Sequence, residues 1–239
     1  MSQEKEKVFS EQTKLLLNYL GHPNRYGETS LPRPFFIEFA GSPSSGKTTI
    51  IVELDKFLRR HGLRVFCPQE GAEAVRHIER STPVYNIRTG TYALNLLLDL
   101  SHGHAYDVVI FDRGIFDVYC WMIFHKERGQ LTEEACKLAQ SFFLSDLWTD
   151  SMDAAFFMVC DAKEAMEREM RLSLTDKEAF ASNPKTIATL VNRYREAFKV
   201  LSPKYKQLEL IDTTSLQEYE MVEQMINKIL DILVKKISG

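Results

Sequence analysis

The stretch GSPSSGKTT at residues 41–49 constrains the fold of this chain more than any other feature. It directly follows an apolar run, FFIEFA, at residues 35–40, and it has the GxxxxGK(S/T) spacing of a phosphate-binding loop. Glycines let the backbone curl around an anion, and the free amides at the start of the following helix point at phosphate oxygens. The sequence therefore predicts a buried strand, a phosphate-binding loop and a helix in direct succession.

The side chains of this loop indicate a nucleotide and a metal, and we expect ATP and Mg²⁺. Lys47 supplies a positive charge for the phosphates, and Thr48 supplies a hydroxyl for the magnesium ion. The residues expected to hold the nucleotide are Gly41, Ser42, Ser44, Ser45, Gly46, Lys47, Thr48 and Thr49. The alternative is a glycine turn beside a solvated lysine, which would bind no ligand.

Further short apolar runs follow, separated by longer amphipathic segments. The predicted strands lie at residues 35–40, 63–67, 107–111, 154–159 and 208–211. Buried strands that alternate with helices form parallel sheets that are covered on both faces and bind ligands beyond the carboxyl ends of the strands. We predict an α/β, three-layer fold with a five-stranded parallel sheet flanked by helices, in one domain over residues 35–239.

Residues 1–34 differ from this pattern. Apolar side chains at helical spacing over residues 8–20 predict an accessory helix, and the segment 21–34, which contains several Gly and Pro residues, reads as a linker. At the other end of the chain, residues 216–237 repeat apolar side chains in the pattern of a helix that packs on a sheet.

Composition limits the partners and the compartment. The formal net charge of -3 and the pI near 6.1 give no broad basic field, so nucleic acid is not an expected partner. No apolar run approaches the roughly 18 residues that span a bilayer, and the polar N-terminus does not resemble a secretory signal. We expect no membrane association and a cytoplasmic location. The four cysteines stand far apart and predict reduced thiols.

The sequence lacks the further motifs that two classes of nucleotide-binding protein require. A GTPase of the Ras type reads its base with NKxD, but Asn227-Lys228 is followed by Ile-Leu inside the predicted last helix. A motor or transporter ATPase usually ends a later strand in Asp-Glu, whereas Asp112 is followed by Arg113. A kinase is the reaction class that the sequence favours.

The motif VVIFDRGIFD at residues 108–117 ends an apolar strand in an aspartate and an arginine. A phosphate-binding loop followed by this motif resembles P-loop small-molecule kinases of the thymidylate kinase and deoxynucleoside kinase group. In detail it resembles the AAA-type P-loop kinase family that contains nicotinamide riboside kinase domains. The residues that carry the resemblance are Asp112, Arg113, Gly114 and Asp117.

The resemblance implies that Asp112 organises magnesium together with Thr48, and that Arg113 faces the acceptor or the transferring phosphate. It also implies a helical lid. The residues alone leave open another interpretation, in which Asp112 caps the next helix and Arg113 is a surface side chain.

The second predicted strand runs into CPQEGAEAV at residues 67–75. The resemblance places a glutamate just past this strand, where it accepts the proton of the acceptor hydroxyl. Glu70 is the candidate, and Glu73 is the alternative. Glutamates are also common in a first helical turn because they interact favourably with the helix dipole, so a structural role stays open.

Arg168 and Arg171 follow the fourth predicted strand and share one face of a helix. The resemblance implies that they belong to the lid and neutralise charge on the transferring phosphate. However, Glu164 and Glu167 each precede one of these arginines by four residues. A solvated helix with two ion pairs fits the same sequence.

These observations predict ATP- and Mg-dependent phosphoryl transfer to a small acceptor, with a nucleoside, a nucleotide or a nucleoside-like metabolite as the expected class. The candidate catalytic residues are Lys47, Glu70, Asp112, Arg113, Arg168 and Arg171, and the candidate metal ligands are Thr48 and Asp112. The alternative is a nucleotide-binding regulatory ATPase or switch without a small-molecule acceptor. A macromolecular acceptor and a homodimer are both compatible with the sequence.

Overall fold

The computed structural model describes residues 3–19, 33–71, 77–103, 105–172 and 183–238. Its strands are β1 (Phe35–Gly41), β2 (Val65–Phe66), β3 (Val108–Asp112), β4 (Met152–Val159) and β5 (Leu208–Asp212). Its helices are α1 (Gln3–Tyr19), α2 (Lys47–Arg60), α4 (Pro83–Leu100), α5 (Ile115–Glu127), α6 (Glu133–Phe143), α7 (Asp146–Thr149), α8 (Ala162–Leu172), α9 (Pro184–Leu201) and α10 (Glu218–Ser238).

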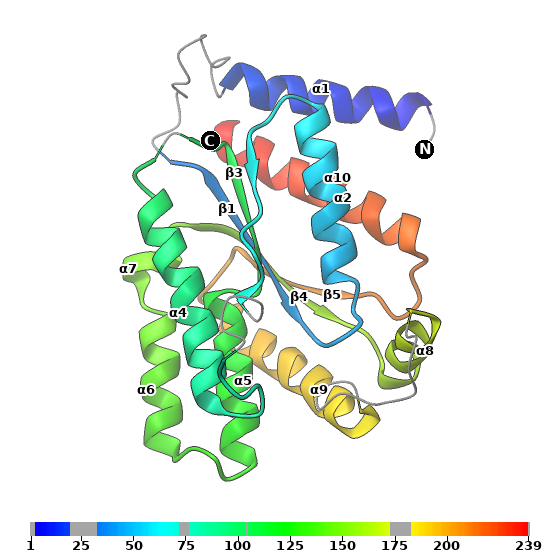
Figure 1. Ribbon diagram of the computed structural model, residues 1–239. Helices are drawn as coiled ribbons and strands as arrows, with labels where there is room; N and C mark the ends of the chain where they lie inside the picture. Colours follow the sequence, from blue (N-terminus) through cyan, green and yellow to red (C-terminus); the bar gives the residue numbers. More distant parts are fainter. Residues whose placement is uncertain (1–2, 20–32, 72–76, 104, 173–182, 239) are drawn as a thin grey trace.

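The described strands form one parallel sheet in the order β2-β3-β1-β4-β5 (Figure 1). The central strand β1 pairs with β3 on one side and with β4 on the other. Phe39 is in register with Asp112 and Gly41 with Met158, so the three central strands end at the same edge. The predicted α/β fold with a five-stranded parallel sheet is confirmed.

Helices cover both faces of the sheet and complete three layers (Figure 1). Buried side chains of α4, α5, α6 and α9 form one core with Phe36 and Ala40 of β1, and those of α1, α2 and α10 form the other with Ile37 and Phe39. The alternation along β1 is the period of two that a strand imposes on its side chains. Within the described ranges, no helix is both long and apolar enough to cross a membrane.

Some element bounds differ from the predicted ones. β2 spans two residues rather than 63–67, because the Arg64 amide donates to the side chain of Asp107, at 2.7 Å to Oδ2, instead of to a neighbouring strand. β4 begins at Met152 rather than 154, and both added residues are buried. Such end effects depend on neighbours that are distant in sequence.

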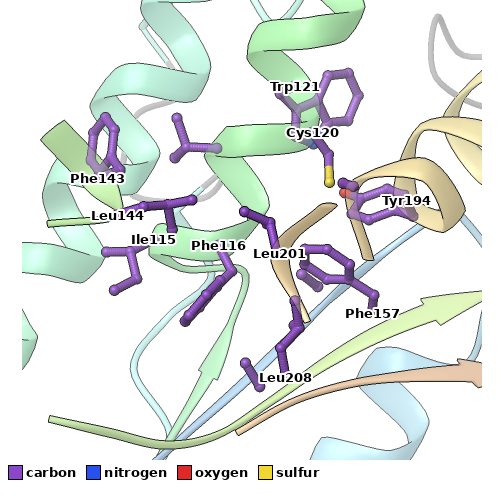
Figure 2. Packing of buried hydrophobic residues seen from close by; sticks show 14 of the residues in the cluster. Ile115, Phe116, Cys120, Trp121, Phe143, Leu144, Phe157, Tyr194, Leu201 and Leu208 are labelled. Atoms are coloured by element: carbon purple, nitrogen blue, oxygen red, sulfur yellow. The ribbon is translucent and has the colours of Figure 1, made fainter. Parts of the chain in front are cut away.

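The core beneath α5 and α9 combines aromatic and aliphatic side chains, and Figure 2 shows part of it. Phe116 packs edge-on against Tyr205 with ring centroids 5.3 Å apart, and Phe157 packs in the same manner against Tyr194 at 5.2 Å. The hydroxyl of Tyr194 donates to a carboxylate oxygen of Asp117. A polar contact therefore extends from α9 to α5 inside an otherwise apolar cluster.

Helix α1 packs on the remainder of the chain. Phe9 and Leu16 are buried, and Phe9 lies edge-on to Phe57 of α2 with ring centroids 5.6 Å apart. Gln12 Nε2 donates to Asp231 Oδ1 of α10 at 2.7 Å. A helix is thus present where residues 8–20 predict one. Residues 21–32 of the predicted linker lie outside the described ranges, and the division of the chain at residue 34 stays a prediction.

Gly90 of α4 allows two other helices to approach closely. A Cβ at this position would lie 2.3 Å from Val118 Cγ2 of α5 and 2.9 Å from Phe143 Cε1 of α6. Alanine is favoured over glycine in a helix interior by roughly 1 kcal/mol, but overpacking a close-packed core costs about 1–3 kcal/mol. Because the overlap is severe, we expect Gly90→Ala to lower the free energy of unfolding by about 1–2 kcal/mol.

Urea denaturation measures this difference. Gly103→Ala is the matched control, because a Cβ there would meet its nearest neighbour, the Leu100 carbonyl oxygen, at 3.6 Å. The control should stay within about 0.5 kcal/mol of the wild type. Equal stability of the two variants would contradict the close contact of α4 with α5 and α6.

Candidate active site

The loop between β1 and α2 lies at the carboxyl edge of the sheet and has an unusual backbone. Gly41 has a φ of 144° and Gly46 a φ of 91°, and a Cβ on Gly41 would lie 1.9 Å from the carbonyl oxygen of Met158. That oxygen instead accepts the amide of Ser42 at 3.0 Å. Ser44 also has a positive φ, 55°, and such strain in a non-glycine residue is typical of functional sites.

Lys47 begins α2 and is buried inside this loop. Its Nζ donates to the carbonyl oxygen of Ser42 at 2.7 Å, and to the Gly41 carbonyl and Ser45 Oγ at 3.3 Å each. Burial, followed by the nearby positive charge of Arg113, lowers the pKa of Lys47 to about 8. The ammonium group is therefore still mainly protonated at neutral pH, next to the amides that bind a phosphate in such loops.

Thr48 and Asp112 are brought together from the loop and from the end of β3. Thr48 Oγ1 donates to Asp112 Oδ2 at 3.1 Å. The other carboxylate oxygen, Asp112 Oδ1, is buried and has no hydrogen-bond partner among the described residues. A buried oxygen without a partner is costly, and Mg²⁺ is commonly held by one or two carboxylates together with phosphate oxygens. Thr48 and Asp112 therefore fit a magnesium ion.

A cavity of about 570 Å³ opens beside the loop, on the side of β4 and β5. Its size lies within the usual range for cofactor pockets. Its walls come from the loop, from α8 and from the segment that joins β5 to α10. The lining residues are Ser44, Gly46, Lys47, Thr48, Thr49, Glu164, Arg168, Thr214, Ser215, Leu216, Gln217, Glu218 and Met221.

Arg168 of α8 joins three parts of this cavity wall. Its Nη2 donates to the carbonyl oxygen of Thr213 at 2.7 Å, and its Nη1 to the carbonyl oxygen of Ser44 at 3.4 Å. The ion pair with Glu164 is also present, with Nε 2.9 Å from Oε1. Arg168 is thus more than one half of a solvated pair, because it links α8 to the phosphate-binding loop and to the end of β5. The side chain of Arg171 lies outside the described part of the chain.

Arg113 occupies the position just after β3 with a φ of 66°. Its Nη1 donates to both carboxylate oxygens of Asp117 at 3.1 Å, and its Nε lies 3.4 Å from Glu70 Oε1. Its guanidinium carbon is 5.9 Å from the centre of the Trp121 ring. The side chain is 20% exposed, so the alternative of a surface arginine is wrong. The structure instead joins Arg113 to α5 and to the segment after β2.

Glu70, the candidate proton acceptor, is half-buried beside Arg113. Burial raises the pKa of its carboxyl group above the ordinary value, and the positive charge of Arg113 acts in the opposite direction. A raised pKa brings a carboxylate closer to the value at which it exchanges protons efficiently near neutral pH. The alternative candidate, Glu73, lies outside the described residues.

Three side chains that are not among the predicted site residues lie around the first turns of α5, the helix that follows Arg113. Glu38 of β1 is fully buried and accepts three backbone amides at the start of α5. Burial raises the pKa of its carboxyl group, and the three amides act in the opposite direction because they stabilise the carboxylate. Tyr194 donates to Asp117, and the Nε1 of Trp121 is buried without a hydrogen-bond partner in the described part of the chain. Glu38, rather than Asp112, thus caps α5. In the sequence, this role of Glu38 is indicated by its position as the single charged residue in the apolar run FFIEFA.

A protein family described as an AAA domain matches residues 36–207, which is most of the chain. This chain belongs to that AAA domain family. The matched segment of the AAA domain extends from β1 to the residue before β5 and includes the phosphate-binding loop, Glu70, Asp112, Arg113 and α8. Helices α1 and α10 and strand β5 lie outside the match.

Solved structures of deoxyadenosine kinase from M. mycoides have the same fold as this AAA domain. A structure with the products dCMP and a flexible dCDP bound matches with a TM-score of 0.61 and 17% identity, over 82% of this chain and 100% of that chain. Structures with bound dCTP and bound dATP match at TM-scores of 0.58 and 0.56, again with 17% identity over 82% of this chain, and cover 100% and 99% of theirs. The resemblance to AAA-type and deoxynucleoside kinase-like P-loop proteins is confirmed at the level of family and fold.

Proposed function

We propose that this protein catalyses ATP- and Mg-dependent phosphoryl transfer to the hydroxyl or phosphate of a small acceptor, namely a nucleoside, a nucleotide or a nucleoside-like metabolite. One observation carries the proposal. Lys47 lines the cavity beside the loop, and it is also close enough to Glu70, Arg113 and Asp112 for their charges to shift its pKa. The buried ammonium group of Lys47 therefore lies between the proposed nucleotide cavity on one side and the charged groups of Glu70 and Arg113 on the other.

On the donor side, the loop amides and Lys47 bind the phosphates, and the cavity takes the remainder of the nucleotide. Thr48 and Asp112 hold magnesium, which when bound neutralises charge on the donor phosphates. Arg168 shapes the cavity wall and, with Arg171, belongs to the proposed lid. These roles require positioning and electrostatic stabilisation, which supply most of the catalysis in phosphoryl transfer.

On the acceptor side, Glu70 takes the proton of the attacking group. As the acceptor oxygen forms its bond to the terminal phosphorus, the bond to the bridging oxygen breaks and ADP leaves. Arg113 neutralises the negative charge that is shared by the three equatorial oxygens. Because Asp117 fixes the Arg113 guanidinium, little reorganisation is needed during the reaction.

Asp112→Asn tests the proposed metal site. The amide keeps the shape of the side chain but removes its charge. In the presence of magnesium, we therefore expect ATP to bind roughly 10- to 100-fold more weakly than to the wild type. Titration calorimetry of ATP at increasing magnesium concentrations measures this change without any acceptor. Asp99→Asn, on an exposed face of α4, is the control. Equal magnesium dependence in both variants would contradict the assignment of Asp112.

The function itself is tested by ADP release from ATP and magnesium across a panel of nucleosides, nucleoside monophosphates and nicotinamide riboside. An acceptor-dependent rate that is lost in Asp112→Asn supports the proposal and identifies the acceptor class. ATP binding with slow hydrolysis, unaffected by every acceptor of the panel, would overturn it in favour of a nucleotide-dependent switch or a macromolecular acceptor.

A further inference from the structure

Glu38 occupies an unusual place for a carboxylate. It lies in the middle of β1, the central strand of the sheet, and its side chain is 0% exposed. Its neighbours along the strand, Ile37 and Phe39, are also fully buried and face the opposite core. Charged side chains are almost never fully buried unless they are paired, so this carboxylate must have specific partners.

The partners of Glu38 are backbone amides at the start of α5. Oε1 accepts the amides of Gly114 at 3.0 Å and Asp117 at 2.9 Å, and Oε2 accepts the amide of Phe116 at 3.1 Å. The first amides of a helix have no partners within the helix, and a carboxylate is favoured at this end of the helix dipole. One side chain therefore joins the central strand to the first turn of the helix that follows Arg113.

Gly114 explains why the Asp-Arg pair is followed by glycine. Its φ is -150°, an extended value that any residue adopts, so backbone freedom is not the reason. A Cβ on Gly114 would lie 2.6 Å from Glu38 Oε2 and 2.7 Å from its Cδ. Any larger residue would displace the carboxylate from the amides that it binds. The glycine and the buried glutamate are therefore two halves of one contact.

This contact fixes Arg113 from both sides along the chain. The Arg113 amide donates to the carbonyl oxygen of Phe39, the residue after Glu38, at 2.8 Å. Beyond Gly114, the first turn of α5 carries Asp117, whose carboxylate holds the Arg113 guanidinium at 3.1 Å and accepts the Tyr194 hydroxyl. The backbone of Arg113 is thus attached to β1 at Phe39, and Asp117, which binds the Arg113 side chain, is attached to β1 at Glu38.

We propose that Glu38 is a positioning residue for the acceptor side of the active site, and that it acts by holding the first turn of α5 so that Arg113 faces Glu70 and the transferring phosphate. The inference rests on the proposed function, because Arg113 has its role only in phosphoryl transfer. Glu38 itself touches no substrate. Its loss should therefore change acceptor turnover much more than ATP binding.

Glu38→Gln tests the proposal. Glutamine keeps one oxygen that can accept two amides, but its NH2 group cannot accept the amide of Phe116. We expect kcat/KM for the acceptor to fall roughly 10- to 100-fold, the range for small misplacements of a catalytic group. The dissociation constant for ATP should stay close to that of the wild type. Asp107→Asn is the matched control, because Asp107 is also a buried carboxylate that accepts a backbone amide, that of Arg64, at the opposite end of the sheet.

A double-mutant cycle with Arg113→Ala separates positioning from a general loss of stability. If Glu38 acts through Arg113, Glu38→Gln should lower kcat/KM by less than about twofold in the Arg113→Ala background. A full, additive loss in that background would overturn the inference, as would an equal loss in Asp107→Asn. Gly114→Ala disturbs the same contact, because its Cβ would displace the Glu38 carboxylate. It should likewise lower kcat/KM for the acceptor and leave ATP binding nearly unchanged, so the test does not depend on the folding of one variant.

Hydrogen exchange keeps this inference distinct from the proposed function. The amide of Phe116, which loses its acceptor, should exchange faster in Glu38→Gln than in the wild type, whether or not any acceptor is phosphorylated. If the wild type phosphorylates none of the acceptors, the proposed function fails first. Unchanged exchange at the Phe116 amide would overturn the anchoring role of Glu38 independently.

Discussion

Glu70→Gln is expected to slow acceptor phosphorylation by roughly 10²–10⁴-fold, the usual contribution of a general base. The amide is nearly isosteric, but it cannot accept the proton of the attacking group. The 3.4 Å ion pair with Arg113 becomes a neutral contact, so the local packing is largely retained. Single-turnover measurement with saturating ATP isolates the chemical step from product release.

ATP binding provides the internal comparison for Glu70→Gln. Because Glu70 is not among the residues that line the 570 Å³ cavity, the dissociation constant for ATP should change little. Glu133→Gln, on the exposed surface of α6, controls for the loss of a charge. A wild-type rate of phosphorylation in Glu70→Gln would remove this residue from the mechanism, whereas a comparable loss in ATP affinity would assign it to the donor side.

Lys47→Met is the second substitution with a large expected effect. Methionine fills a similar volume in the buried loop but removes the ammonium group that donates to the Ser42 carbonyl at 2.7 Å. We expect kcat to fall roughly 10²–10³-fold, as when one preorganised donor is removed from a developing negative charge. Initial rates with saturating acceptor and a range of ATP concentrations measure kcat separately from KM.

Lys56→Met is the control for Lys47→Met. Lys56 lies on the same helix, α2, and forms an exposed ion pair with Glu53, so its substitution should leave the kinetics unchanged. The pKa of Lys47 also predicts a pH effect. Its folded value of about 8 is below its ordinary value, so the ammonium form and the activity that depends on it should decline as the pH rises through about 8. Activity that stays constant up to pH 9 would contradict an essential ammonium group in the free enzyme.

The residues that sequence analysis identified best belong to local motifs. The phosphate-binding loop requires a strand, a glycine turn and a helix in succession, and all of its determinants lie within nine residues. Asp112 also belongs to a local motif, VVIFDRGIFD, whose resemblance to P-loop kinases implies a metal ligand at the end of a strand. The structure places Asp112 beside Thr48, although the two residues are 64 positions apart in the sequence.

Residues that act through distant backbone groups could not be found in this way. Glu38 was visible as a charge within FFIEFA, but the amides that it binds are at least 76 positions away. Periodicity gives no signal for such a partner, because the contact depends on how β1 and α5 meet. Tyr194 reads as one more aromatic residue in an amphipathic helix, and only its packing beside Asp117 gives it a further role.

The central position of β1 also affects how mutations on its two sides combine during evolution. The cavity beside the phosphate-binding loop is built on the β4 and β5 side, whereas Glu70 and Arg113 come from the β2 and β3 side, and Lys47 lies where the two halves meet. Lys47 and the contact of Thr48 with Asp112 join the two halves, so mutations at these residues should be coupled. Mutations farther apart, without shared partners, should have approximately additive effects on free energy. In a sheet of this order, a lineage can acquire a new acceptor while it keeps its phosphate donor.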